Sequence, residues 1–243
     1  MKHLSSLLLL ALLALGPAAR AQGGGAPVGW LKLSADAPLR GRWGLYSEVE
    51  TRQGNAQLGG QQLGRVGFRL HVAPSFSLTT GYVLAANEYG PTDGPKAPEH
   101  RFYQEVAFTD VSGPVRASHR LRAEERWLRP IPEAAFQFAP RLRYQLRLVV
   151  PLRSGGLLPV GGLFLVAANE MFASLGPREG QNFLEENRAS AGLGYRASRR
   201  TTLELAYLHQ SQATGIGGAS LARNALQLSV AMATPSRVAL VRR

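Results

Sequence analysis

The chain has 243 residues, no cysteine and a formal net charge of +12 at pH 7. The lack of cysteine excludes both a disulfide framework and a catalytic thiolate. The positive charge would suit a nucleic-acid-binding protein, but the arginines are spaced singly along expected strands and do not cluster on a helix, so we expect no nucleic-acid partner.

The first 21 residues have the pattern of a cleaved signal peptide. Lys2 gives a positive start, Leu4–Leu15 is an apolar run, and Ala19–Ala21 provides a small-x-small cleavage site. The apolar run is shorter than the roughly 20 residues that a membrane-spanning helix needs. We therefore expect export, with the mature chain beginning at Gln22.

Residues 22–41 are expected to form a leader or extension. This segment opens with the flexible Gly23–Gly25, and Trp30–Asp36 within it has a strand-like pattern. Two interpretations of Trp30–Asp36 stay open: a periplasmic or lumenal extension, or one of two additional strands in a larger barrel.

Residues 42–232 are predicted to be a series of β-strands, and residues 233–243 a C-terminal tail. Arg65 and Arg69 alternate with Val66 and Phe68, a two-residue period that places polar and apolar side chains on opposite faces of a strand. Each segment reaches the roughly 9–11 residues of a tilted transmembrane strand. The ten predicted strands are 42–52, 62–72, 76–88, 100–110, 115–128, 138–150, 161–173, 183–197, 201–211 and 222–232.

These features predict a transmembrane antiparallel up-and-down β-barrel of about ten strands, with twelve as the alternative. Short links and longer Gly/Pro-rich links alternate along the chain, as do the periplasmic turns and outer loops of outer-membrane barrels. A soluble periplasmic β-sandwich or barrel gives a similar alternation. Strand length and the signal peptide favour the bacterial outer membrane, with lipid and the barrel-assembly machinery as partners. The oligomeric state is left open.

Charged residues recur near the predicted outer ends of the strands. The triplets Glu50–Arg52, Glu124–Arg126 and Glu186–Arg188 each place Glu and Arg on one strand face, and Ala-Ala-Asn-Glu occurs at 85–88 and 167–170. A lipid-facing Arg costs about 2–4 kcal/mol at the midplane, so these charges should face the lumen. The predicted belt comprises Glu50, Arg52, Glu88, Glu124, Arg126, Arg141, Arg143, Glu170, Glu186 and Arg188. A deeper row is predicted at Arg65, Arg69, Arg120, Arg122, Arg143, Arg147 and Glu204.

Three functions fit this belt. It can fill a small barrel as structural packing, or line a passive pore that favours small anionic solutes, because Arg outnumbers Glu. The third is a lipid-modifying hydrolase, for which Ser118, His119 and Glu124 supply the residue types. Adjacent strand residues face opposite sides, so Ser118 and His119 should not meet. We expect no catalytic residues, no metal site and no cofactor.

Several motifs occur in the order typical of one family. They include Glu50-x-Arg52, Arg120-x-Arg122-x-Glu124-x-Arg126, Arg141-x-Arg143, Asn169-Glu170 and Glu186-Asn187-Arg188. Over about residues 42–230 the chain resembles the domain-of-unknown-function 2490 family. The resemblance implies an outer-membrane β-barrel without an established activity. One departure is the end of the chain, Val238–Arg243, which lacks the terminal aromatic residue of many barrel proteins.

Overall fold

The computed structural model describes residues 27–55, 58–88, 96–153, 158–176, 183–213 and 220–233. The predicted signal peptide and residues 234–243 of the predicted tail lie outside these ranges. In the described part of the chain, no helix is long and apolar enough to cross a membrane.

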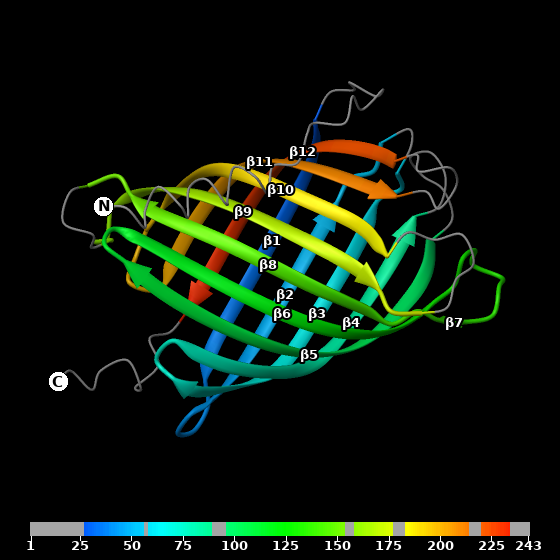
Figure 1. The fold of residues 1–243 in the computed structure, drawn as a ribbon, viewed down its shortest axis with the longest axis horizontal. Helices are drawn as coiled ribbons and strands as arrows, with labels where there is room; N and C mark the ends of the chain where they lie inside the picture. Colours follow the sequence, from blue (N-terminus) through cyan, green and yellow to red (C-terminus); the bar gives the residue numbers. More distant parts are fainter. Residues whose placement is uncertain are drawn as a thin grey trace.

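The described residues form an all-β structure, shown as a ribbon in Figure 1. The strands are β1 (Val28–Pro38), β2 (Trp43–Arg52), β3 (Gln61–Ala73), β4 (Phe76–Glu88), β5 (Lys96–Ser112), β6 (Val115–Leu128), β7 (Gln137–Phe138), β8 (Arg141–Pro151), β9 (Leu163–Ser174), β10 (Leu184–Tyr195), β11 (Thr201–Ala213) and β12 (Ser220–Ala233). Nine of these ranges differ from a predicted strand by no more than a few residues at either end, and β5 begins four residues earlier than predicted.

The strands close into a barrel, as predicted. The sheet runs β5-β4-β3-β2-β1-β12-β11-β10-β9-β8-β6, and pairing between β5 and β6 joins its two edges. The two-residue β7 pairs only with the end of β6 and stands outside the barrel wall. The closed barrel therefore has eleven strands.

The eleventh strand is β1, which contains Trp30–Asp36. The prediction that residues 22–41 precede the barrel is wrong from Val28 onward, and the barrel extends over Val28–Ala233 rather than 42–232. Here β1 pairs with β12 in parallel, with Val28 opposite Ala225 and Asp36 opposite Ala233. Because successive strands alternate in direction, an odd number makes the first and last strands parallel.

The two ends of the barrel differ in their links. Residues 39–42, 74–75, 113–114, 152–162 and 196–200 join strands at one end, which we call the short-turn end. Residues 53–60, 89–95, 129–140, 175–183 and 214–219 join them at the other, the long-loop end. Gly113, with a φ of 57°, allows the two-residue link between β5 and β6, because this left-handed conformation costs glycine little. β1 begins at the long-loop end, and β12 ends at the short-turn end.

The barrel wall is polar inside and apolar outside. Arg65 is 6 % exposed and faces the lumen, whereas its neighbour Val66 is 47 % exposed on the outer face. Arg122 and Leu121 show the same contrast, at 2 % and 45 %. Because polar and apolar residues alternate along each strand, the inner face of the wall is polar and its outer face is apolar. We call this arrangement inverted polarity, since a water-soluble protein has the reverse.

Aromatic packing fills part of the lumen next to β3 and β4. Gly67 and Gly81 lie opposite each other, and Gly81 lies opposite Tyr103 of β5. A Cβ at Gly81 would lie 2.7 Å from the Gly67 Cα and 2.8 Å from the Tyr103 ring. The fully buried Tyr103 ring thus occupies the space left by two missing side chains.

Candidate functional site in the barrel lumen

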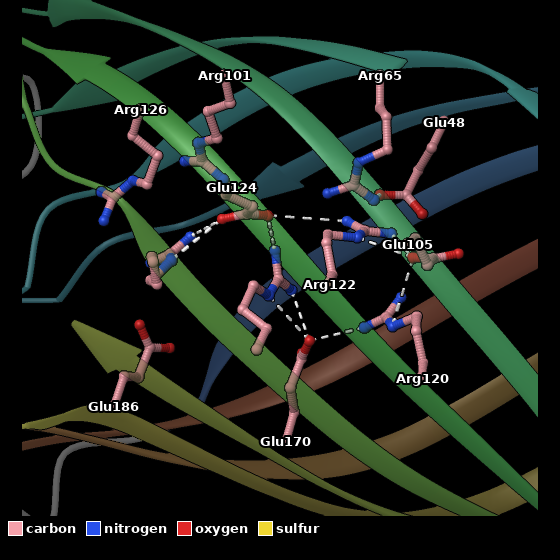
Figure 2. A network of polar contacts seen from close by, with 12 residues as sticks. Glu48, Arg65, Arg101, Glu105, Arg120, Arg122, Glu124, Arg126, Glu170 and Glu186 are labelled. Atoms are coloured by element: carbon pink, nitrogen blue, oxygen red, sulfur yellow. Dashed lines mark hydrogen bonds and ion pairs between the residues drawn. The ribbon is translucent and has the colours of Figure 1, made fainter. Parts of the chain in front are cut away.

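Arginine and glutamate side chains form an array of ion pairs in the lumen, part of which is drawn in Figure 2; contacts link those of β5, β6, β8 and β9, whereas Glu48–Arg65, Glu50–Arg52 and Glu186–Arg188 pair separately. The register of the strands creates it: on β6 and β8, Glu124 lies opposite Arg141, and Arg122 lies opposite Arg143. Residues two apart on each strand then add further charges on the same face. We call this network the charged belt; its acidic members are Glu48, Glu50, Glu99, Glu105, Glu124, Glu170 and Glu186, and its basic members are Arg52, Arg65, Arg101, Arg120, Arg122, Arg126, Arg141, Arg143 and Arg188.

Glu124 is a centre of this belt. Its Oε1 accepts a hydrogen bond from Arg143 Nη1 at 2.6 Å, and its Oε2 accepts one from Arg141 Nη2 at 2.6 Å. Arg122 Nη1 lies 3.9 Å from the same carboxylate. Glu124, which the sequence places in the belt, therefore binds both Arg141 and Arg143 of β8. Charge-assisted bonds of this kind are among the stronger hydrogen bonds in proteins.

A second centre, Glu170, connects three strands. Arg143 donates two hydrogen bonds to Glu170, from Nε at 3.0 Å and Nη2 at 2.7 Å, and Arg120 Nη2 donates another at 2.7 Å. Arg120 also lies 3.8 Å from Glu105, which Arg122 binds through Nε at 2.8 Å. These contacts run from β9 through β8 and β6 to β5 (Figure 2).

The three predicted Glu-x-Arg triplets face the lumen but differ in their pairing. Glu50 and Arg52 form a bidentate pair at 2.9 Å for both bonds, and Glu186 binds Arg188. Arg126, by contrast, donates to Glu99 at 2.6 Å. Glu124 pairs instead with Arg141 and Arg143 of β8. A shared sequence pattern therefore fixes the facing of these residues but not their partners.

Sequence reasoning missed several belt residues. Glu99 and Arg101 form a bidentate pair with both bonds at 2.9 Å, and each is 3 % exposed or less. Glu99 lies just before the predicted strand 100–110, whereas Arg101 lies within that strand but is absent from the predicted belt. Glu99-His100-Arg101 is itself a Glu-x-Arg triplet, so the signal was available. Glu48 and Glu105 were missed as well.

Glu88 is the one predicted belt residue that the structure places elsewhere. Its neighbour Asn87 faces the lumen and donates to Glu99 at 2.9 Å. Glu88, with the opposite parity, ends β4 and forms an ion pair with the half-exposed Lys96 at 3.2 Å. The second Ala-Ala-Asn-Glu repeat has the opposite arrangement: Glu170 faces the lumen, and Asn169 pairs with Asn187 on the other face. The motif therefore has opposite orientations in the two strands: its Asn faces the lumen in β4, whereas its Glu faces the lumen in β9.

Aromatic rings separate and support the guanidinium groups. Trp30, from the unexpected first strand, has the guanidinium carbons of Arg52, Arg188 and Arg223 4.9, 5.3 and 5.0 Å from its ring centre. Arg188 thus approaches a residue three strands away around the wall. Such cation–π contacts add stability where charges are desolvated. Phe172 makes the same kind of contact with the guanidinium groups of Arg141, Arg143 and Arg188.

Solvent reaches the lumen side chains unequally. The Glu124 side chain is inaccessible, and that of Arg122 is 2 % exposed. Nearer the short-turn end, Arg147 and Glu204 form an ion pair with side-chain exposures of 29 % and 20 %. A cavity of about 120 Å³ extends along this side of the belt, with walls that include Lys32, Gln145 and Ser229. Side chains in the lumen are therefore more accessible to solvent toward the short-turn end than around Glu124.

The residues considered for a hydrolase do not come together. Ser118 Oγ lies 3.2 Å from Thr109 Oγ1, while His119 Nδ1 lies 2.8 Å from the Tyr144 hydroxyl. Glu124 is held by arginines. The opposite facing of Ser118 and His119 predicted from strand parity is found.

Comparisons with known proteins agree with the motif order. Residues 28–219 match the family described as "Protein of unknown function (DUF2490)". The chain is also 31 % identical over 187 residues to a protein of Methylorubrum extorquens that is described only as uncharacterized; the match covers 72 % of this chain and 75 % of that protein. The match to the family begins at Val28, which is also the first residue of β1.

Proposed function

We propose that this chain, which belongs to the DUF2490 family of proteins of unknown function, is an outer-membrane β-barrel whose charged belt closes the lumen to large solutes. Small solutes pass only where the belt opens, and anions pass in preference to cations. The belt is first a structural element and second a selectivity filter.

The inverted polarity of the wall carries the membrane proposal. Eight large apolar side chains of the outer face are 45–56 % exposed, namely Val66, Phe68, Leu84, Phe102, Leu121, Leu165, Leu193 and Leu205. A surface covered with apolar groups on this scale is unfavourable in water and marks contact with lipid or another apolar partner. Buried Arg and Glu on the inner face complete the pattern of an outer-membrane barrel.

The belt supports closure combined with anion preference. Its members come from strands on several sides of the barrel, and most are less than 10 % exposed. Lumen-facing basic residues outnumber acidic ones, because Lys32, Arg69, Arg147 and Arg223 add to the belt arginines, whereas Asp36, Glu185 and Glu204 add to its glutamates. An excess of fixed positive charge lowers the barrier for anions.

Location can be tested by fractionating cells that express the full chain. We expect the protein in the outer membrane, with unboiled and boiled samples migrating differently in a detergent gel. Recovery in the soluble periplasmic fraction with identical migration would overturn the membrane proposal.

Passage can be tested by recording from refolded protein in planar bilayers. We expect small, infrequent conductance steps for the native protein and larger steps for Glu170→Gln, which releases Arg120 and Arg143. A salt gradient should give a reversal potential that indicates anion preference. A cation-preferring potential, or no steps in either protein, would contradict the proposed passage.

A further inference from the structure

We infer that the cavity on the short-turn side of the charged belt is a binding site for a small oxyanion, of the size of phosphate or a short carboxylate. The inference rests on the proposed function, in which the lumen admits small anions, and it identifies where such an anion is held. Lys32 is its principal ligand.

The cavity has a suitable size and position. Its volume of about 120 Å³ is several times the roughly 10–15 Å³ that one water molecule requires. It lies against the tightly packed belt on one side, where Glu50, Arg52 and Arg143 contribute to its walls. A small oxyanion with some water fits this space.

The charges in the walls favour an anion. The basic lining residues are Lys32, Arg52, Arg65, Arg120, Arg143, Arg147 and Arg188, and the acidic ones are Glu48, Glu50, Glu170 and Glu204. Each of these acids is already paired, with Arg65, Arg52, Arg143 and Arg147 respectively. A cation entering the cavity would therefore compete with arginines that already hold every carboxylate.

Lys32 is the cation best placed to bind a ligand. Among the described residues, no carboxylate lies within ion-pair distance of its ammonium group, although it faces the cavity and is only partly buried. Glu50 is its register partner on β2, but Arg52 occupies both oxygens of Glu50. On the other side Lys32 lies opposite Ser229 of β12, whose hydroxyl also lines the cavity.

Two further donors in the cavity wall lack acceptors. Trp30 is 3 % exposed, and its indole Nε1–H has no hydrogen-bond acceptor among the described residues. The same holds for Arg65 Nε, in a side chain that is 3 % exposed. Buried donors in native proteins are nearly always satisfied. Both nitrogens are inaccessible to solvent, so an oxyanion in the cavity reaches them only when a lining side chain turns. An oxyanion offers several acceptor oxygens and places a negative charge next to Lys32, whose own charge already acts on Glu48 and Glu50.

Trp30 fluorescence can report anion binding, because the Trp30 side chain lines the cavity. Trp43 and Trp127 are the other two tryptophans of the chain, and they can be replaced by Phe so that only the lumen residue fluoresces. We would titrate this refolded full-length variant in detergent micelles with sodium phosphate and, separately, sodium acetate. A bulky sulfonate salt would hold the ionic strength constant.

We expect a saturable change in Trp30 fluorescence with at least one of the two anions. Lys32→Gln should weaken binding at least tenfold, and Lys32→Arg should restore most of it. Lys96→Gln, which removes a half-exposed lysine at the strand-end pair with Glu88, should leave binding unchanged. A linear response, or equal affinity in Lys32→Gln, would overturn the site.

A second measurement covers the possibility that Lys32→Gln fails to refold. Binding to the native protein should broaden the ³¹P resonance of phosphate, and excess sulfate should reverse the broadening. Absence of broadening, together with no saturable response to acetate, would overturn the inference without any variant.

The outcomes also separate this site from the proposed function. Binding without conductance in bilayers would support the site and contradict passage. Anion-selective conductance without saturable binding would support passage and overturn the site.

Discussion

Arg143 donates a 2.6 Å hydrogen bond to Glu124 in a part of the lumen that solvent does not reach. The same arginine binds Glu170 on the next strand, so one guanidinium joins two carboxylates from opposite neighbours. Contacts of this kind link the charges of β5, β6, β8 and β9, whereas Glu48–Arg65, Glu50–Arg52 and Glu186–Arg188 form separate ion pairs.

Glu124→Gln should strongly destabilise the barrel. The substitution preserves shape but leaves Arg141 and Arg143 without their shared charge, and an uncompensated buried charge costs about 3–5 kcal/mol. The midpoint of urea unfolding in detergent, followed by tryptophan fluorescence, measures the effect. Glu125→Gln is the matched control, because Glu125 is the next residue and faces outward. Equal midpoints for the two variants would show that the Glu124 pairs contribute little.

Gly81→Ala should destabilise the protein, although alanine is the smallest possible replacement. The new Cβ would meet the Gly67 backbone and the Tyr103 ring at distances below 3 Å, and overpacking costs about 1–3 kcal/mol. Gly64→Ala provides the control, since a Cβ there meets nothing within 4 Å. Unfolding midpoints of the two variants give the comparison, and a larger loss for Gly64→Ala would contradict the packing described.

Tyr103→Phe should have almost no effect on stability. The buried hydroxyl has no hydrogen-bond partner among the described residues, and removing such a group avoids its desolvation cost. We expect a change of less than about 1 kcal/mol, of either sign. A loss comparable to that of Glu124→Gln, measured under the same conditions, would mean that the hydroxyl is bonded.

The parallel pairing of β1 with β12 predicts a specific cross-link. Leu31 of β1 lies opposite Leu228 of β12, and Leu228 lies opposite Leu205 of β11. Because the chain has no cysteine, Leu31→Cys with Leu228→Cys creates a single pair at neighbouring-strand distance, which suits a disulfide.

Oxidation of this double variant should give a faster-migrating band in non-reducing gels after denaturation. Leu31→Cys with Leu205→Cys, two strands apart, should not react. If only the second pair cross-links, the barrel does not close through β1 and β12.

Arg223 should protect the link between β2 and β3. It donates to the backbone carbonyls of Gln53 at 3.2 Å and Gly59 at 3.0 Å, and to the side chain of Gln210 at 2.7 Å. Arg223→Met removes these bonds, and we expect faster cleavage within 53–60 by a protease of broad specificity. Arg116→Met, an exposed arginine near the short-turn end, is the control. Equal cleavage rates would show that Arg223 does not hold the link.

Strand positions and the facing of most belt residues followed from the sequence because a strand has a strict two-residue period. Arg65, Arg122 and Arg143 could be assigned to the lumen on that basis alone. Glu88 was wrongly assigned to the lumen because its motif is the same as that of Glu170. In β4, however, the alternation of side chains turns Asn87 to the lumen and Glu88 to the other face. Glu99 was missed because local alternation does not mark where a strand begins.

The sequence by itself determined an all-β barrel with charges inside, since alternation of polar and apolar residues is a local property of each strand. Tertiary structure decided the number of strands, the parallel pairing of β1 with β12 and the partner of each charge. These depend on register and closure between segments far apart in the chain, so Arg126 binds Glu99 on β5 and Arg188 approaches Trp30 on β1. The cavity beside Lys32 exists for the same reason: only the closed wall brings β1, β8 and β11 around one space.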